Sequence, residues 1–349
     1  MAPSIRACNS SEAGMTINHD ISPGLWTLAW RRLRADRIAM AALAVVGAFL
    51  LLLVLSASGL IANDWEDEVA VNYAPPGFIG ADAATAALAR PQAPTPPNAF
   101  DPLARELEQL KAQVRATHPP RAKALTLPFG ADKWGHDVLK KTVKGGETSI
   151  VVGLVAAFVA VALGTLFGAV SGFYGGIVDD LFNWFYSIFT SIPSILMILT
   201  VAAVLQQKGV TTIVLILGLT GWTGPYRLIR AEYIKHKARE YVMAADAIGA
   251  SNWRKMFSHI FPNVSHVALV QLSILVVGFI KAEVILSFLG FGVPVGTVSW
   301  GSMLNEAQNE LILGKWWQLA AAAGAMALLV TAFSLFTDAL RDALDPKLK

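Results

Sequence analysis

The 349-residue sequence has little charge and a single cysteine. Charged residues make up 15% of the chain, against about 25% in soluble globular proteins, while 54% of the residues are hydrophobic. This composition argues against a soluble enzyme. The formal net charge of only +3 gives no global basic field that would attract nucleic acid. Because Cys8 has no partner cysteine, the chain forms no intrachain disulfide and no thiolate metal cluster.

The sequence also lacks the short motifs of common enzyme classes. It contains no G-x-x-x-x-G-K-[ST] loop to hold ATP phosphates, no H-E-x-x-H zinc motif and no G-x-S-x-G nucleophile turn. We therefore expect no catalytic site, no metal site and no bound cofactor in this chain. Energy for any active process would have to come from another polypeptide.

Long uncharged runs are abundant and predict an all-α integral membrane protein. A helix needs about 20 apolar residues to cross the hydrocarbon core of a bilayer. Six spans are expected, at residues 38–62, 149–173, 182–204, 210–226, 264–288 and 316–337. Pro193 is expected to kink the third span.

The charges that flank the first span predict its orientation. Arginines precede it, from Arg31 to Arg37, and acidic residues follow at 64–68, so the positive-inside rule places the N-terminus in the cytoplasm. With six spans the C-terminus returns to the same side. Trp30 and Leu33 recur among the arginines at helical spacing, which predicts a short helix on the membrane surface.

These assignments divide the chain into five regions. They are a cytoplasmic tail with the interfacial helix (1–37), the first transmembrane helix (38–62), a proline-rich extracytoplasmic segment (63–147), a five-helix core with a cytoplasmic loop at 227–263 (148–338), and a cytoplasmic tail (339–349). We expect residues 1–21 to lack regular structure. The proline-rich segment is expected to hold one helix, near residues 103–114, between extended stretches.

Small residues recur at every fourth position along the second expected span. They are Ala156, Ala160, Gly164, Gly168, Gly172 and Gly176. Small side chains let transmembrane helices approach closely, so we expect this stripe to pack against another helix. The alternative is that glycine is simply common in membrane helices.

A few polar residues inside the expected spans are candidates for the translocation pathway. Lys281 and Glu283 are charged, and intramembrane charges often mark a transport route or an ion relay. They do not share one helical face, so each needs its own partner or water. Ser187, Thr190 and Ser191 are further candidates, although their hydroxyls suit the backbone carbonyls of the kinked third span equally well.

The cytoplasmic loop predicts two short amphipathic helices. The first has apolar positions at Tyr241, Ala244, Ala245 and Ile248, and the second at Trp253, Met256, Phe257 and Ile260. Gly249 ends the first helix and Ser251 can cap the second. Such a pair either packs on its own spans or presents a helix to a cytoplasmic partner, and the residues alone favour neither.

Several sequence segments resemble one family of transporters. The segment from Glu240 to Ser251, followed by His259-Ile-Phe-Pro-Asn263, resembles the cytoplasmic EAA loop of bacterial ABC importer permeases. Residues 129–139, 172–179, 287–293, 299–304 and 340–346 also resemble that family, in the family's order. The chain looks like the second permease subunit of the dipeptide/oligopeptide/nickel family.

The resemblance implies a type I ABC importer permease fold in the bacterial cytoplasmic (inner) membrane. It implies that the chain forms a pathway for di- or oligopeptides together with a homologous permease subunit. Two cytoplasmic ATPase subunits, which carry ATP and magnesium, and an extracytoplasmic substrate-binding protein would complete the importer. Closure of the ATPases would switch the spans between inward-open and outward-open states.

The resemblance also implies which residues dock on the ATPase. By position they are Glu240, Tyr241, Ala244, Ala245, Gly249, Ala250, Ser251, Pro262 and Asn263. Two positions depart from the family pattern. Met243 stands where many members have a glutamate, which puts one salt bridge to the ATPase in question, and His136 stands where an arginine is common.

Other cargo and another transport class remain as alternatives. Nickel and peptide-like antibiotics travel through similar permeases. An ion-coupled secondary transporter would need inverted repeats and intramembrane carboxylates, and Glu283 is the single candidate carboxylate. A non-transporting scaffold would not explain why the amphipathic pair occurs together with the other family segments.

Overall fold

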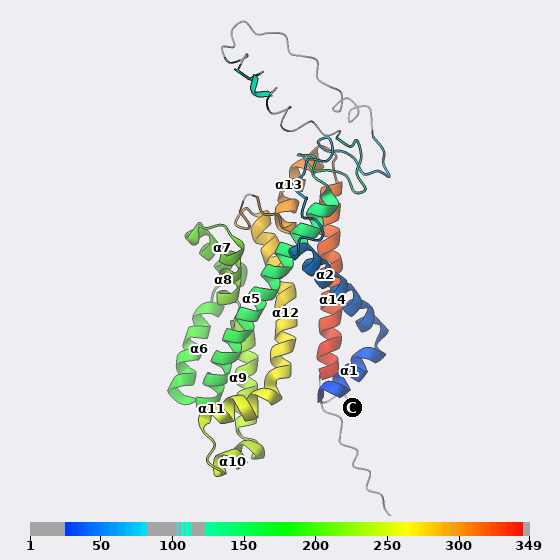
Figure 1. Cartoon of the computed structure of the whole chain (residues 1–349). Helices are drawn as coiled ribbons and strands as arrows, with labels where there is room; N and C mark the ends of the chain where they lie inside the picture. The colour runs from blue at the N-terminus through cyan, green and yellow to red at the C-terminus, as the bar shows by residue number, and fades with distance from the viewer. Residues whose placement is uncertain are drawn as a thin grey trace, which may run out of the picture.

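The computed structural model describes residues 25–81, 103, 106, 107, 109–111, 113, 123–294 and 296–344. Within this part of the chain the protein is helical and has isolated β-bridges but no strand, as the all-α prediction requires (Figure 1). The expectations for residues 1–21, for Cys8 and for most of the proline-rich stretch lie outside the described residues.

Helices follow one another along almost the whole described chain. They are α1 (Leu25–Ala35), α2 (Arg37–Ala57), α5 (Val138–Tyr174), α6 (Gly176–Thr190), α7 (Ser194–Leu205), α8 (Val210–Thr220), α9 (Thr223–Lys237), α10 (Glu240–Ala247), α11 (Asn252–Arg254), the π-helix η1 (Lys255–Ile260), α12 (Phe261–Phe288), α13 (Trp300–Ile312) and α14 (Trp317–Leu344).

Four of the described helices are long and apolar enough to cross a membrane: α2, α5, the continuous run of α11, η1 and α12, and α14. Helices α6 and α7 meet the same test as a pair that is bent by 83°. Pro193 lies at the bend as the N-cap of α7, which confirms the predicted kink.

The fourth expected span, residues 210–226, is not among these candidates. Helix α8 has only 11 residues and ends before Gly221, and the next helix, α9, carries Arg227 and Arg230. The total of six spans therefore stays a prediction.

Helix α5 begins at Val138, earlier than the expected start at 149. Asp137 caps the helix by accepting a hydrogen bond from the backbone N of Leu139 at 2.8 Å. Lysines occur in the first turns of this helix, and one of them, Lys141, is buried. Its Nζ lies 2.7 Å from Asp132 and 2.6 Å from Glu306.

Three glycines of the predicted stripe lie where α5 meets α9. A Cβ added to Gly164, Gly168 or Gly172 would come within 2.6, 2.8 and 2.6 Å, respectively, of a backbone oxygen of α9 or its N-cap. Only glycine permits this approach. Gly176 does not share it, because it lies beyond the end of α5 with φ +53° and its Cβ would meet no atom within 4 Å.

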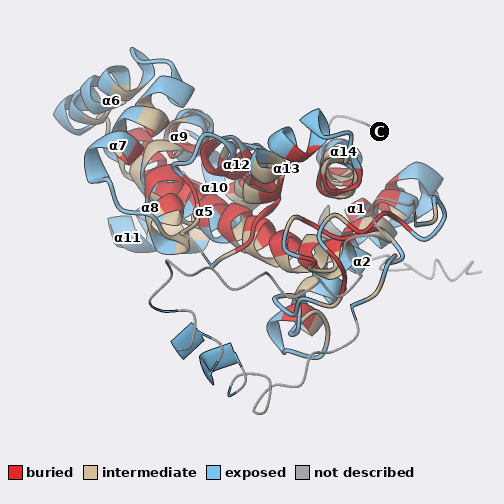
Figure 2. Ribbon diagram, turned by 90° about the horizontal axis from the view of Figure 1, so that it is seen from above, coloured by how far each residue is buried: buried red, intermediate tan, exposed pale blue. Residues whose placement is uncertain are grey.

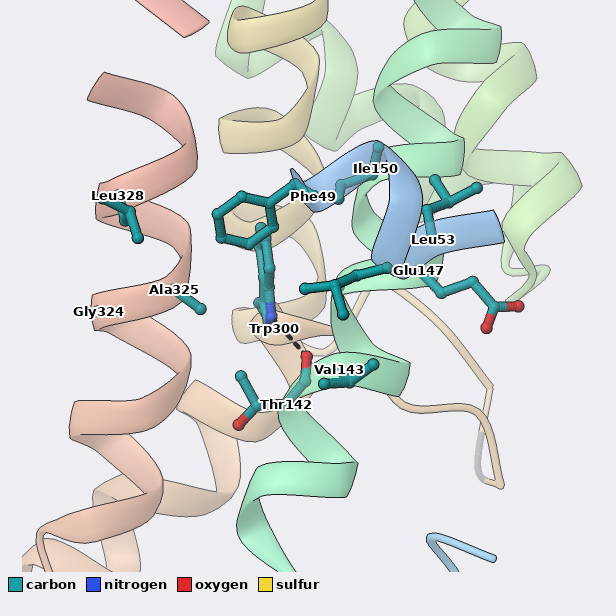
Figure 3. Close-up of a pocket in the computed structure, with 12 residues that line it drawn as sticks. Phe49, Leu53, Thr142, Val143, Glu147, Ile150, Trp300, Gly324, Ala325 and Leu328 are labelled. Carbon is teal, nitrogen blue, oxygen red and sulfur yellow. Dashed lines mark hydrogen bonds between the residues drawn. The ribbon is translucent and has the colours of Figure 1, made fainter. Parts of the chain in front are cut away.

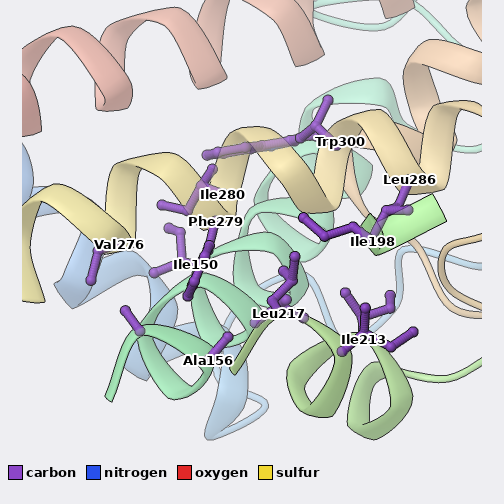
Figure 4. Close-up of a cluster of buried hydrophobic side chains, with 14 of the residues drawn as sticks. Ile150, Ala156, Ile198, Ile213, Leu217, Val276, Phe279, Ile280, Leu286 and Trp300 are labelled. Atoms are coloured by element: carbon purple, nitrogen blue, oxygen red, sulfur yellow. The ribbon is translucent and has the colours of Figure 1, made fainter. Parts of the chain in front are cut away.

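The main hydrophobic core is formed by α5, α8, α12 and α13, with contributions from α7 and α14. Figure 4 shows Ile150 and Ala156 of α5 facing Leu217 of α8 and Phe279 and Ile280 of α12. Buried residues are concentrated along α5 and its neighbours, whereas α6 has no buried residue (Figure 2). Helix α5 is thus the central element, and α6 is peripheral.

A small cap lies at one end of the bundle, opposite α10 (Figure 1). We use this name for residues 69–80 and 123–137, which pair through bridges between Ala70 and Ala124 and between Pro76 and Leu127. A small cluster of apolar residues lies between the two segments. Trp317 holds the cap on α14 by donating from Nε1 to the carbonyl of Ala131 at 2.7 Å.

Candidate functional site

Helix α10 lies at the end of the molecule away from the cap, beside α11 (Figure 1). It starts after Arg239, whose backbone is extended, and is followed by Gly249 at φ +80°, a conformation that favours glycine. The Ser251 hydroxyl then accepts a hydrogen bond from the backbone N of Arg254 at 3.4 Å and caps α11. The predicted first helix, glycine break and serine cap are therefore all present.

The buried face of α10 differs from the predicted one. Val242 and Ala245 point into the protein, and Ala245 is 4% exposed. Tyr241 and Ala244 are exposed, and Ile248 is 84% exposed. The predicted apolar stripe is therefore wrong. Positions 242 and 245 form the inner face, and three of the four residues of the predicted stripe point outward.

Contacts from α9 and η1 hold α10 in place. Val242 packs in a cluster that includes Tyr233 of α9, Met256 of η1 and Ile260, and the Tyr233 hydroxyl donates to the carbonyl of Met256 at 3.2 Å. Lys255 lies 2.5 Å from Asp246. Burial raises the pKa of the Tyr233 hydroxyl, which therefore stays neutral. The buried side of α10 is thus held in place, and its other side chains point outward from it.

The second predicted helix does not end before Pro262. Met256 and Ile260 are buried as expected, but η1 leads directly into α12, which contains Pro262 in its first turn. Proline has no N–H to donate, and a π-helix at the preceding turn accommodates the altered hydrogen-bond pattern. The next residue, Asn263, donates from Nδ2 to the carbonyl of His259 at 2.8 Å.

Several large apolar side chains are exposed on the outward side of this loop. Met243 and Trp253 are exposed, Trp253 by 65%, together with Ile248. Ala244 and Glu240 share this outward side, while Ala250 is half-buried. We call Met243, Ala244, Ile248 and Trp253 the coupling face. Met243 departs from the family pattern in sequence, whereas Ile248 and Trp253 are apolar residues that belong to the predicted inner stripes.

Glu283 does not line an open pathway in this chain. It is 0% exposed and accepts hydrogen bonds from the hydroxyls of Ser149 and Ser287, both at 2.6 Å. The backbone N of Trp300 donates to Ser149 Oγ at 3.2 Å. This buried group joins α5, α12 and α13. Lys281 is exposed on another face of α12, as the helical spacing predicted, and forms no ion pair within the described residues.

The hydroxyls near the bend bond to their own helix. Ser187 donates to the carbonyl of Asn183 at 2.8 Å, Thr190 to that of Tyr186 at 3.1 Å, and Ser191 to that of Ile188 at 2.8 Å. The backbone alternative is therefore the one present, although all three residues are exposed.

Sequence reasoning missed a polar network between α5, α6 and α9. Arg230 forms two hydrogen bonds of 2.6 Å to Asp179. The Ser171 hydroxyl also donates to Asp179 and lies 3.0 Å from the hydroxyl of Tyr226. Nothing in the sequence pairs these residues, which are up to 59 positions apart along the chain.

A cavity of about 250 Å³ lies between α2, α5 and α14 (Figure 3). Apolar side chains such as Phe49 and Leu328 line it, and Trp300 donates from Nε1 to the carbonyl of Thr142 at 3.0 Å. Its carboxylate, Glu147, is engaged by Ser56 at 2.5 Å and Lys144 at 2.8 Å. Because the polar groups that line the cavity already have hydrogen-bond partners, they are not available to bind a peptide backbone.

Comparison with known proteins connects this architecture to membrane transport. Residues 164–349 match the family described as binding-protein-dependent transport system inner membrane component. Residues 24–76 match the family described as the N-terminal TM domain of oligopeptide transport permease C. The first match covers the glycine-packed part of α5, the coupling face and the helices up to α14.

Individual relatives agree with these matches. The oligopeptide transport system permease protein OppC of Bacillus subtilis is 37% identical over 221 residues, 63% of this chain and 72% of the relative. The dipeptide transport system permease protein DppC of Lactococcus lactis is 30% identical over 325 residues, 91% of this chain and 90% of the relative. The chain belongs to the family of binding-protein-dependent transport system inner membrane components and is a multi-pass membrane permease.

Proposed function

We propose that this chain is one of the two transmembrane subunits of an ATP-driven importer for di- or oligopeptides. The observation that carries the proposal is the coupling face, an exposed apolar surface that stands on the buried contacts of Val242 and Ala245. Relatives named as oligopeptide and dipeptide permeases support peptides as the cargo.

The coupling face has the properties of a docking surface. A short helix with small and apolar outward residues fits a groove on a partner protein. Its inner face is fixed to α9 and η1, so a force applied at Ala244 or Ile248 passes to α12 rather than deforming the loop. Movement of the docked partner is thereby coupled to the spans.

The partners in this proposal supply what the chain lacks. A homologous permease completes the pathway, and two ATPase subunits, which bind ATP and magnesium, dock at the coupling faces of the two permeases. A substrate-binding protein delivers peptide on the cap side. The coupling face and both termini then lie in the cytoplasm, in agreement with the arginines before α2.

Purification of the tagged chain from its native membrane in mild detergent tests the proposal. We expect a second permease and Walker-motif ATPases to co-purify in stoichiometric amounts. Peptide uptake by the reconstituted complex should require ATP and should be inhibited by unlabelled peptide but not by nickel. A chain that purifies alone and transports without ATP would contradict the proposal.

A further inference from the structure

Helix α1 is amphipathic and lies along the end of α14. Ala29 packs against Ala343 and Leu344, and Leu33 is also buried. The remaining described side chains of α1 are exposed, and they include a tryptophan and three arginines. Helix α1 therefore has one face packed on the protein and a basic face that is exposed.

The segment that holds α1 has more basic than acidic residues. Residues 25–37 contain four arginines and a single acid, Asp36. Asp36 is engaged as the N-cap of α2, accepting from the backbone N of Ile38 at 2.8 Å and of Ala39 at 3.2 Å. Arg31, Arg34 and Arg37 are exposed and form no ion pair with any residue that the structure describes.

Charges at the adjoining end of α14 do not reverse this balance. Asp338 and Asp342 are exposed there, and Arg341 offsets one of them. The combined surface of α1 and the end of α14 therefore keeps a positive net charge. Three guanidinium groups without protein partners in the described chain match the chemistry of an anionic, phosphate-bearing ligand.

The position of α1 indicates where such a ligand comes from. Only Asp36 separates α1 from α2, a helix able to cross the membrane, so the arginines lie at the level where a bilayer has its headgroups. Trp30 and Ile38 are exposed beside them. Tryptophan favours the membrane interface, and an exposed isoleucine at the start of a span favours acyl chains.

We propose that α1 binds anionic phospholipids. Arg31, Arg34 and Arg37 contact the phosphates, while Trp30 and Ile38 insert between the adjoining acyl chains. Clusters of basic residues beside a transmembrane helix attract anionic headgroups in this way. The inference does not depend on the proposed cargo or on the ATPases.

Native mass spectrometry of the full chain in detergent, titrated with phosphatidylglycerol or phosphatidylcholine, tests the proposal. We expect the wild type to retain phosphatidylglycerol in preference to phosphatidylcholine. The triple variant Arg31→Gln/Arg34→Gln/Arg37→Gln should lose that preference by at least about tenfold. The triple variant with lysine at the same three positions keeps the charge and should keep most of the preference.

A control with the same change in charge uses exposed or half-buried lysines outside α1. The variant Lys111→Gln/Lys208→Gln/Lys315→Gln should retain phosphatidylglycerol like the wild type. Equal losses in the two glutamine variants would show a net-charge effect and overturn the site. Unchanged retention in the arginine-to-glutamine variant would also overturn it.

Two further measurements separate a lipid from other anionic partners. Inorganic phosphate at millimolar concentration should not displace phosphatidylglycerol, because the acyl contacts of Trp30 and Ile38 are available only to a lipid. Displacement by phosphate would mean a simple anion site and would overturn the proposal. The proposal would also be overturned if the arginine-to-glutamine variant kept its lipid preference but no longer bound the proteins that co-purify with the wild type.

Discussion

Arg230 and Asp179 form a bidentate ion pair that connects α9 to α6. The Nε and Nη2 atoms of Arg230 each lie 2.6 Å from a carboxylate oxygen of Asp179. Ser171 of α5 donates to the same carboxylate. Because α6 has no buried residue, it is held to the rest of the chain by this pair and by aromatic contacts such as that of Phe185 with Trp222.

Asp179→Asn should lower the thermal midpoint of the detergent-solubilised protein, since the arginine loses a charged partner. Hydrogen bonds to charged groups contribute about 1.5–3 kcal/mol, and partial exposure of this pair favours the lower end. Asp180→Asn is the matched control, because Asp180 is exposed and forms no ion pair within the described residues. Equal midpoints for the two variants would contradict the importance of the pair.

Gly164→Ala should separate α5 from α9 and destabilise the protein. Its Cβ would lie 2.6 Å from a backbone oxygen, which cannot move without moving the helix. Gly278→Ala, also within a helix, meets no atom within 4 Å and should be neutral or stabilising by up to about 1 kcal/mol. Thermal unfolding of both variants checks this, and a stable Gly164→Ala protein would refute the close approach.

Glu283→Leu should destabilise the protein more than Glu283→Gln does. Leucine removes the acceptor for Ser149 and Ser287, whereas glutamine keeps one carbonyl oxygen in the same place. We expect the glutamine variant to remain folded and to transport. If it folds normally but loses transport, Glu283 has a direct role in the pathway, contrary to its burial.

Glu310, near the cap, should make stability depend on pH. Burial raises its pKa to about 7, Lys141 opposes the shift, and Asp132 and Glu306 add to it. The folded state then holds a proton that the unfolded state loses above about pH 4.5. Stability should therefore fall as the pH rises from about 4.5 to 7 and then level off.

Glu310→Gln should flatten this dependence and be more stable than the wild type at pH 8. The carboxylate is 1% exposed and its Oε2 has no hydrogen-bond partner within the described residues, so ionisation at that pH is costly. Thermal midpoints measured from pH 4.5 to 8 provide the comparison. Glu66→Gln, at an exposed position, should follow the wild-type curve, and an unchanged slope in Glu310→Gln would refute the assignment.

Ala244→Asp and Ala245→Asp should fail in different ways. Ala244 belongs to the exposed coupling face, so its variant should fold normally and lose ATPase binding and transport. Ala245 is buried, so its variant should be less stable, because aspartate would enter an apolar cluster without a partner. Thermal midpoints and co-purification separate the two effects, and loss of stability in both variants would contradict the assigned faces.

The sequence predicted features that depend on local patterns. The glycine stripe from Gly164 to Gly172, the bend at Pro193 and the turn at Gly249 all follow from backbone geometry and spacing. The inner face of α10 was mistaken because alanine fits either side of a short helix. Burial, rather than residue type, distinguishes Ala245 from Ala244.

The sequence did not predict features that depend on residues far apart along the chain. In the first turn of α5, the buried Lys141 is paired with Asp132 and Glu306, which lie 9 and 165 positions away along the chain. The interior position of Glu283 likewise depends on a serine 134 residues away. Helix α13 was also missed, because its Ser299 cap and mixed composition give no long apolar run.

The chain turns where η1 leads into α12 (Figure 1), and this gives the loop the geometry of a crank. At 1.5 Å per residue the arm from Asn252 to Ile260 is about 14 Å long, and the arm from Phe261 to Phe288 is about 42 Å. If the crank rotates as one piece, a displacement at Trp253 is magnified about threefold at the far end of α12. A displacement of about 2 Å at Trp253 would then correspond to about one helical turn at that end.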